Sequence, residues 1–415
     1  MRDQILSNLD NPAQLERLYR EDKSGFKRSF NVLYPELKDS TFASFWNARL
    51  NFAKEEISWG TAKDLVFVII TALLAGLIAK LPVILSIDEE FFYMRNAGFI
   101  VFPMLSAYFA WKNQLSAGKI VFITGATLVG LLFINFFPDD TGRGDSLILS
   151  CIHLPILLWA VLGFAFVGEQ RNDVEKRLGY LSYNGDLIVM TTLILIAGGI
   201  LTGVTIGLFD LIGFKIEKFY FEYVVLVGLP AAPILGTYLI QTNPQLVGKV
   251  SPVIARIFSP LVLVMLVIYL IAIIYSGKDP YNDREFLLIF NGLLIGVMAI
   301  IFFSVAEASR KGQNLAETWI LLLLSVVTIV VNGIALSAIL FRISAWGFTP
   351  NRAAVLGSNA LILINLLLVT VQLFRVVSKK TDITGVGKVI SWFLPVYCVW
   401  AIIVTFLFPF LFEFK

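Results

Sequence analysis

The stretch Phe-Arg-Ile-Ser-Ala-Trp-Gly-Phe-Thr-Pro-Asn-Arg, residues Phe341–Arg352, separates two long apolar runs, Thr318–Leu340 and Ala353–Leu373. Thr349 is followed by proline, an order typical of a helix N-cap and the first helical position, which predicts where the second helix begins. A glycine eases the turn, and Trp346 has the side chain that favours the headgroup layer of a membrane. The stretch therefore predicts a short loop between two membrane helices, either an anchored hairpin or a site for a substrate or lipid headgroup.

The composition of the whole chain is typical of a membrane protein. Of its 415 residues, 57% are hydrophobic and 15% are charged, with a mean hydropathy of +0.80. Soluble domains carry about one quarter charged residues, so that class is excluded. The net charge of +3 is not gathered into basic stripes, which argues against nucleic acid as a partner. Both cysteines, Cys151 and Cys398, lie in apolar runs, so we expect no disulfide, metal site or cofactor.

The first 64 residues are polar and hold equal numbers of acidic and basic side chains. No cleavable signal peptide is expected there, so the first membrane helix serves as an uncleaved anchor. Asn11-Pro12-Ala13-Gln14 predicts a capped helix through about Asp22, and a second helix is predicted over Thr41–Glu56.

The apolar side chains of that second helix share one face by their spacing: Phe42, Phe45, Trp46, Leu50 and Ala53. This face lies either on the membrane or against the helix bundle. Because balanced charge attracts anionic lipid weakly, packing against the bundle is favoured. We interpret residues 1–64 as a cytoplasmic or interfacial helical segment that is able to dock a protein partner.

Eleven apolar segments follow, most of them near the ~20 residues that a helix needs to cross the hydrocarbon of a bilayer. They are Leu65–Ile87, Asn96–Trp111, Ile120–Phe137, Ser146–Val167, Leu187–Phe209, Tyr223–Ile240, Ile257–Tyr275, Phe286–Val305, Thr318–Leu340, Ala353–Leu373 and Val389–Phe412. The second segment is short and the first contains a lysine. The chain is therefore predicted to be an all-α polytopic membrane protein with about eleven transmembrane helices.

The Lys and Arg residues of the loops predict the orientation in the membrane. Loops on the side of the N-terminus carry thirteen of them, against nine on the opposite side, where the acidic residues of the first loops also lie. We therefore expect the N-terminus in the cytoplasm, with the C-terminus and the Phe341–Arg352 loop outside.

Comparison of the chain with itself indicates an internal repeat. At one constant offset, Pro103, Tyr108, Asn113, Gly118 and Lys119 match Pro233, Tyr238, Asn243, Gly248 and Lys249. We interpret the pattern as parallel repeats of 4 + 4 + 3 helices, over residues 65–170, 186–308 and 318–415, related by an axis along the membrane normal. The alternative is chance matching between leucine-rich segments.

The predicted helices hold few groups for catalysis. No Asp or Glu lies well inside a predicted span, so an intramembrane enzyme is disfavoured and no catalytic residue is assigned. Lys80 is the one clear charge inside a span; it either has a function or reaches outward toward Asp88 or Glu89. The single histidine, His153, either moves protons or bonds a neighbouring helix.

Amide side chains mark the two helices beside the opening loop. Asn332, Asn359 and Asn365 lie inside them, and Arg352 and Asn359 share one face by their spacing. The amides either hold helices together or line a path. We hypothesise that Arg352 and the turn after Thr349 bind an anion, a solute or lipid phosphate, at the outer face, because a helix N-terminus adds its dipole to the cation. The other expected partner of this arginine is an outer-loop carboxylate.

Glycine and proline mark two further helices. Helix five contains Gly199, Gly203 and Gly207, a spacing that lets another backbone approach closely. Helix six contains Gly228, Pro230, Pro233 and Gly236, which predicts either a kink or a broken helix that lines a cavity.

Two sets of residues resemble a known family. They are the opening Asn11-Pro12, Leu15-Glu16 and Leu18-Tyr19-Arg20 with Trp46 and Arg49-Leu50, and the loop Trp346-Gly347-Phe348-Thr349-Pro350-Asn351-Arg352. In these motifs the chain is similar to an uncharacterised bacterial family of multi-pass membrane proteins, the domain of unknown function numbered 4153. The resemblance implies a bacterial inner-membrane location and implies no activity, substrate or catalytic residue.

The repeats, the interrupted sixth helix and the amides favour a transporter, permease or flippase for a small solute or lipid. The alternative is a membrane scaffold or sensor subunit of an envelope complex, which docks a partner through residues 1–64. A polar cavity joining Lys80, His153 or Asn365 favours transport, and a closed bundle favours a scaffold.

Overall fold

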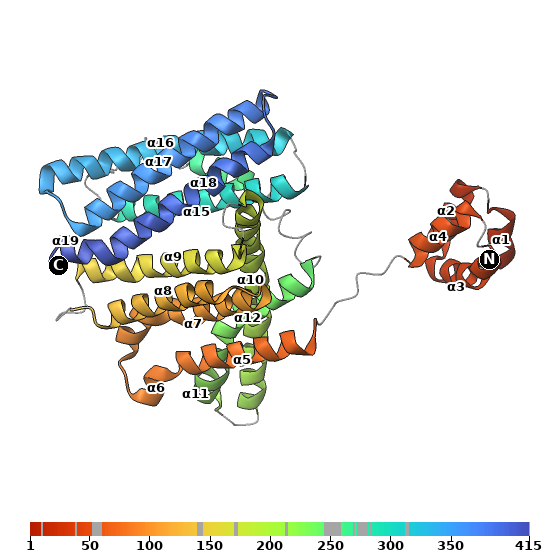
Figure 1. The fold of residues 1–415 in the computed structure, drawn as a ribbon, viewed down its shortest axis with the longest axis horizontal. Coiled ribbons are helices and arrows are strands. Elements are labelled where there is room, and N and C mark those ends of the chain that lie inside the picture. Colours follow the sequence, from red (N-terminus) through yellow and green to blue (C-terminus); the bar gives the residue numbers. More distant parts are fainter. Residues whose placement is uncertain are drawn as a thin grey trace. The chain divides into compact units, whose positions relative to one another are not determined.

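The computed structural model describes residues 1–9, 11–37, 40–51, 60–138, 144–169, 173–211, 215–244, 259–268, 270–271, 281, 284–311 and 315–414. Within these ranges every regular element is a helix. The chain divides into two compact units, Met1–Ser58 and Trp59–Lys415. Figure 1 shows the course of the helices in each unit.

The N-terminal unit has a hydrophobic core of its own. It contains α1 (Arg2–Ser7), α2 (Pro12–Glu21), α3 (Lys23–Leu33), the 3-10 turn η1 (Tyr34–Glu36) and α4 (Thr41–Asn51). The predicted cap of α2 is confirmed, because the Asn11 side chain accepts a hydrogen bond from the backbone N–H of Gln14. Phe26 and Phe30 of α3 lie at the centre of the core.

The predicted apolar face of α4 is only partly correct. Trp46 and Leu50 are buried, at 3% and 6% exposed, together with Ala43, whereas Phe42 and Phe45 are 44% and 64% exposed. The buried face is centred between Ala43 and Trp46 because α2 and α3, within the same unit, supply its partners. Trp46 and Leu50 therefore close the core of the N-terminal unit, and Ala53 lies outside the described residues.

The second unit begins with five helices and continues with a long hairpin. The first part contains α5 (Ala62–Ala79), α6 (Leu81–Leu85), α7 (Glu89–Lys112), α8 (Ala117–Asn135) and α9 (Asp145–Val167). The hairpin contains α10 (Val174–Leu211), α11 (Glu217–Tyr220), the π-turn η2 (Phe221–Val225) and α12 (Leu226–Thr242). The remainder contains a short helix (Ser259–Ile268), α15 (Arg284–Lys311), α16 (Leu315–Trp346), α17 (Pro350–Val377), α18 (Ile383–Ile402), η3 (Ile403–Leu407) and α19 (Phe408–Leu411).

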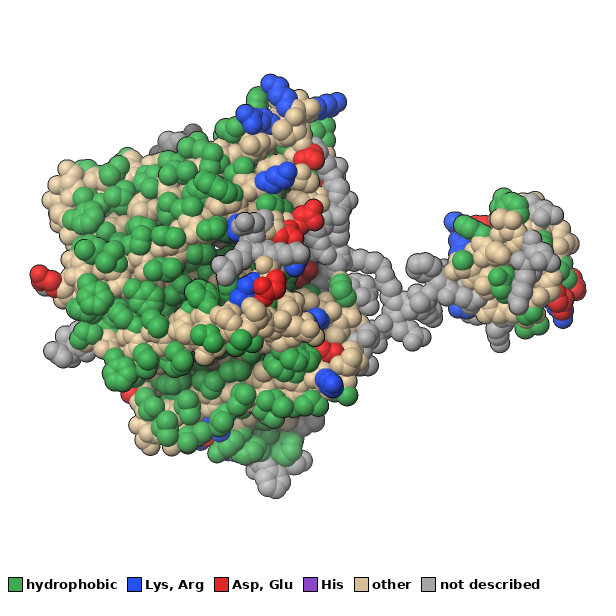
Figure 2. Space-filling model, viewed as in Figure 1, with side chains coloured by type: hydrophobic (Ala, Val, Ile, Leu, Met, Phe, Trp, Pro, Cys, Tyr) green, Lys and Arg blue, Asp and Glu red, His purple; other side chains and the backbone are tan. Residues whose placement is uncertain are grey.

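Nine helices of the described residues are long and apolar enough to cross a membrane. The chain is therefore an all-helical, multi-pass membrane protein. Of the two other predicted spans, one corresponds to the more polar α7, and the other retains only the short helix Ser259–Ile268 within the described ranges. The count of eleven stays a prediction. Apolar side chains cover the face of this unit in Figure 2, as a lipid-facing surface requires.

Two apolar cores hold the second unit together. One is built mainly by α5, α7, α9 and α12, and the other by α15, α16, α17 and α18. The first half of α10 contributes to both, with Leu178 and Leu181 in the second core and Tyr180 and Tyr183 in the first. In Figure 1, α10 lies at a steep angle to α8 and α9. The first half of α10 therefore joins the two halves of the bundle.

Helix α10 begins well before the predicted start at Leu187. Its first turn is capped by Asp173, whose carboxylate accepts hydrogen bonds from the backbone N–H groups of Glu175 and Lys176. The polar segment before Leu187, expected to be a loop, is therefore helical. The expected close packing on the glycines of the second half is not found, since no described atom lies within 4 Å of where a Cβ would stand at Gly199, Gly203 or Gly207.

The sixth predicted span, Tyr223–Ile240, also differs from expectation. Pro230 and Pro233 lie inside a continuous α12, and the irregular turn precedes them at Phe221–Val225. The wide turn is a local irregularity in one helical span, Glu217–Thr242, and no break occurs at the prolines.

Candidate functional site

The loop Phe341–Arg352 is a capped turn between α16 and α17. The Thr349 side chain accepts a hydrogen bond from the backbone N–H of Arg352 at 3.4 Å, so the predicted N-cap is confirmed. Gly347 has a φ of 80°, a conformation that favours glycine. Nη1 of Arg352 donates to the carbonyls of Trp346 at 2.8 Å and Gly347 at 2.7 Å. The guanidinium therefore caps the C-terminal end of α16, where carbonyls lack helical partners.

The indole of Trp346 lies close to two arginines. The guanidinium carbons of Arg342 and Arg352 are 5.7 Å and 5.8 Å from its ring centroid, and the side chain is half exposed. Among the described residues, the partners of Arg352 are thus the backbone of the preceding helix and an aromatic face. Anion binding at this turn stays a prediction.

The predicted amides lie in two separate contacts inside the second half of the bundle. Asn359 donates to Oδ1 of Asn291 at 2.9 Å, and its carbonyl accepts from Asn332 at 3.0 Å, which joins α15, α16 and α17. Asn365 donates to the Tyr397 hydroxyl of α18 at 3.1 Å. These contacts favour the interpretation of the amides as links between helices.

Lys80 and His153 lie elsewhere. Lys80 caps α5, and its Nζ is 3.2 Å from the ring centroid of Tyr223 instead of contacting Asp88 or Glu89. Nδ1 of His153 is 2.9 Å from the carbonyl of Leu149, in its own helix rather than a neighbouring one. No contact within the described part of the chain joins Lys80, His153 and Asn365.

A cluster that sequence reasoning missed surrounds the first half of α10. We call it the α10 polar cluster, and its members are Trp159, Tyr180, Ser182, Tyr183, Asn184, Asp186, Thr237 and Glu307. The hydroxyl of Ser182 donates a hydrogen bond to Oε1 of Glu307 on α15. Glu307 is 4% exposed and Asp186 is 7% exposed. Two carboxylates therefore lie buried within segments long and apolar enough to cross a membrane.

Gly185 brings α10 and α15 close together. A methyl group at this position would overlap the ring of Phe303, one turn of α15 before Glu307. Glycine is thus the residue that lets Ser182 and Glu307 meet.

The remaining contacts of the cluster tie α10 to α9 and α12. The hydroxyl of Tyr183 is 2.7 Å from that of Thr237 on α12. Nε1 of Trp159 on α9 donates to Oδ1 of Asn184 at 3.0 Å, and the Tyr180 hydroxyl donates to the Trp159 carbonyl at 2.6 Å. The cluster therefore connects helices of both cores through hydrogen bonds.

The expectation that no Asp or Glu lies well inside a span stays a prediction; Asp186 lies about three turns into α10, directly before the apolar run that begins at Leu187. The run Tyr-Leu-Ser-Tyr-Asn-Gly-Asp, Tyr180–Asp186, reads as a polar loop by hydropathy alone. The feature of the sequence that indicates a helix over this run is Asp173, an N-cap residue that places the start of the helix before Tyr180.

Arg95, which directly precedes the predicted span Asn96–Trp111, is a further buried charge. It is 6% exposed within α7, and its guanidinium lies 4.0 Å from the ring centroid of Phe91. Its Nε has no hydrogen-bond partner among the described residues. Asn96 beside it exchanges two hydrogen bonds with Asn135 of α8, at 2.9 Å and 2.8 Å.

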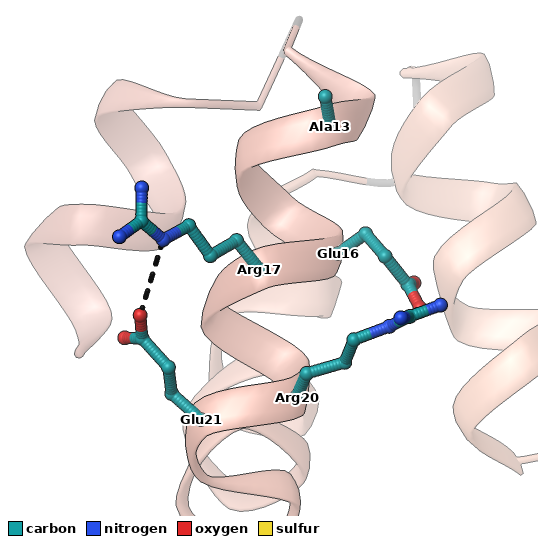
Figure 3. Close-up of a pocket in the computed structure, with 5 residues that line it drawn as sticks. All are labelled: Ala13, Glu16, Arg17, Arg20 and Glu21. Carbon is teal, nitrogen blue, oxygen red and sulfur yellow. Dashed lines mark hydrogen bonds and ion pairs between the residues drawn. The ribbon is translucent and has the colours of Figure 1, made fainter.

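In the N-terminal unit, the residues of the opening motif contact one another. Glu16 accepts from Nε of Arg20 and pairs with Nη2 of Arg49, each at 2.8 Å, and Arg49 lies over the Trp46 ring. A hydrogen bond from Arg20 holds the pKa of Glu16 below its ordinary value. Figure 3 shows the adjacent shallow pocket of about 380 Å³, where Arg17 pairs with Glu21. Each carboxylate here already has a cationic partner.

Among the described residues, no group of three or more His, Cys, Asp or Glu side chains is placed to hold a metal ion. Compared with protein-family models, curated proteins and solved structures, the chain matches none.

Proposed function

We propose that the protein is a membrane transporter of the permease or flippase type, which moves a small solute or a lipid. The observation that carries this proposal is the burial of Asp186 and Glu307 between apolar helices. Ionisable groups inside a membrane protein are costly to bury, and they commonly mark the path of a substrate, ion or proton. A scaffold needs no such groups in its interior.

The chemistry of the α10 polar cluster suits a cation, a proton or the polar part of a solute. Carboxylates accept hydrogen bonds or bind cations, and the hydroxyls of Ser182, Tyr183 and Thr237 supply further donors and acceptors. Because α10 contacts α9, α12, α15 and α18, exchange of these hydrogen bonds would favour different packings of the two cores. Such a change in packing is what alternating access requires.

The orientation and repeats are part of the same proposal. We place the N-terminus in the cytoplasm, the C-terminus outside and the chain in a bacterial inner membrane, in keeping with the bias of loop cations and the family resemblance. An odd number of crossings is supported by Figure 1, where α5 begins at the end of the bundle opposite the C-terminus.

Support for the 4 + 4 + 3 repeats comes from matched positions. Asn113 and Asn243 each end a helix as its C-cap, and Tyr108 and Tyr238 are both buried one turn earlier. In the first repeat, the matched Lys119 pairs with Glu169 after α9 at 3.0 Å.

The test begins with a screen of solutes and lipids by thermal unfolding of the protein in nanodiscs, since a ligand that binds the native state raises Tm. Solutes that raise Tm are then measured for uptake into proteoliposomes. We expect Asp186→Asn and Glu307→Gln to lose uptake, and Glu175→Gln, an exposed carboxylate of the same helix, to keep it. Failure of the native protein to move any solute or lipid, or unchanged uptake in both cluster variants, contradicts the proposal.

A scaffold or sensor role is the second candidate, favoured by the N-terminal unit. This unit is compact with its own core, and it exposes Phe42 and Phe45 side by side on α4. Exposed aromatic side chains of this kind suit a protein partner. Stoichiometric co-purification of an envelope protein, lost in Phe45→Ser and retained in Glu307→Gln, would favour this role over transport.

A further inference from the structure

A groove lies on the outer surface of the membrane unit between α16 and α17. It has a volume of about 740 Å³. Its apolar walls include Leu323 and Val326 from α16 with Val371 and Phe374 from α17, and all four side chains are exposed. In a membrane protein these side chains face lipid.

Basic residues stand at one end of this groove. Arg375 and Lys380 line it, and Lys379 follows in the same turn between α17 and α18. None of the three forms an ion pair with a described residue. Figure 2 shows Lys and Arg side chains gathered at this turn beside the apolar face of α16 and α17. The end of the groove is therefore cationic.

The acidic residue nearest in the turn is already engaged. The Asp382 carboxylate caps α18 by accepting from the backbone N–H of Gly385, and it also accepts from the Thr384 hydroxyl at 2.6 Å. That hydroxyl bond holds the pKa of Asp382 below its ordinary value, so the carboxylate stays ionised in its capping role. The cations are left for an external anion.

The groove runs from the end of α17 into the apolar part of the bundle. From Arg375 to Thr370 α17 rises about 8 Å at the usual rise per residue, and from Leu322 to Val326 α16 rises about 6 Å. The hydrocarbon core of a bilayer is ~30 Å thick, so half of it is about 15 Å. The lining residues therefore contact the first part of an acyl chain whose headgroup lies at Arg375, within one leaflet of the membrane.

We propose that this groove binds one anionic phospholipid, with its phosphate at Arg375 and Lys380 and an acyl chain along Val326 and Val371. A free phosphate would use the cations and leave the apolar walls empty, and a zwitterionic lipid would gain less from two positive charges. The groove shares no residue with the α10 polar cluster and lies at the end of α17 opposite Arg352. This inference is therefore independent of the proposed transport function.

The test measures lipid binding to the full chain by native mass spectrometry, with phosphatidylglycerol and phosphatidylcholine as probes. Each basic residue near a membrane surface contributes about fivefold in affinity for anionic lipid, so Arg375→Gln with Lys380→Gln should weaken phosphatidylglycerol binding about 30-fold. Lys218→Ala, a 90% exposed lysine on α11, is the matched control and should change little. Val371→Trp fills the groove without changing charge and should also release the tightest lipid.

Four results would overturn the proposal. One is equal affinity for the two lipids in the native protein, and another is an unchanged preference in the double variant. The third is displacement of the lipid by inorganic phosphate, and the fourth is its retention in Val371→Trp. Either of the last two would reduce the site to an ion site without a chain. Thermal unfolding of each variant confirms that it is folded, since all the substituted side chains are exposed. None of these outcomes depends on whether the protein transports a solute.

Discussion

The α16–α17 turn and the α10 polar cluster both carry charged side chains, but the surroundings of those charges differ. In the turn, Arg352 is bound by two carbonyls of the preceding helix and an exposed indole, all within a few residues of it. In the cluster, Asp186 and Glu307 are buried where α10 meets other helices. The comparison teaches that a charged side chain bound by backbone groups of its own turn has a structural role. A charged side chain buried between helices points instead to a function.

The largest loss of stability is expected from a larger side chain at Gly185, where α10 and α15 approach each other closely. Gly185→Val places two methyl groups against Phe303 and should destabilise the protein by about 3 kcal/mol, because overpacking forces α10 away from α15. Gly203→Ala on the uncovered half of the same helix should leave stability unchanged or slightly higher. Thermal unfolding in nanodiscs measures both, and equal effects would mean that α10 packs alike along its length.

The next effect concerns the turn. Arg352→Ala removes two charge-assisted hydrogen bonds from the end of α16 and should lower stability by about 2 kcal/mol. Arg352→Lys should recover only part of this loss, because an ammonium lacks the planar fork of guanidinium. Thermal denaturation of the native protein and the two variants in the same lipid checks the expected order of stability, in which Arg352→Lys lies between the native protein and Arg352→Ala. A lysine variant as stable as the native protein would show that charge alone matters there.

A smaller change is expected for the amide links. Asn359→Ala leaves Oδ1 of Asn291 without its donor and should cost about 1 kcal/mol, in line with hydrogen bonds between membrane helices. Thermal unfolding of Asn359→Asp tests the Asn359–Asn291 hydrogen bond without removing the side chain. An ionised carboxylate cannot donate to Asn291, so this variant should also be less stable than the native protein. If Asn359→Ala lost transport but kept its stability, Asn359 would have a functional role and not only a structural one.

The smallest effect belongs to the N-terminal unit and depends on pH. Arg20 holds the pKa of Glu16 below its ordinary value, so the stabilisation is present above about pH 4.3 and is lost as the pH falls through the lowered pKa of the folded state. Glu16→Gln should therefore flatten the acid side of the stability curve slightly and leave Arg17 and Glu21 paired. Acid titration followed by tryptophan fluorescence of the full chain checks this, and identical curves would contradict it.

Much of the fold follows from the sequence, because apolar length and caps are local properties. The start of α17 at Thr349-Pro350 and of α2 at Asn11-Pro12 were both predicted correctly. The α10 polar cluster was not predictable in this way, because its members come from α9, α10, α12 and α15 and meet only after packing. Hydropathy also hides a buried carboxylate at the end of a span, since Asp186 and Glu307 each read as the boundary of an apolar run.

The most direct measurement compares Glu307→Gln with Arg352→Ala in one uptake experiment, with each rate corrected for the amount of folded protein. The side-chain amide that replaces the carboxylate in Glu307→Gln can still accept the hydrogen bond from Ser182, so the variant should fold normally yet lose uptake. Arg352→Ala should unfold at a lower temperature and transport normally while folded. Normal uptake in Glu307→Gln together with loss of uptake in folded Arg352→Ala would contradict the assignment of function to the α10 polar cluster.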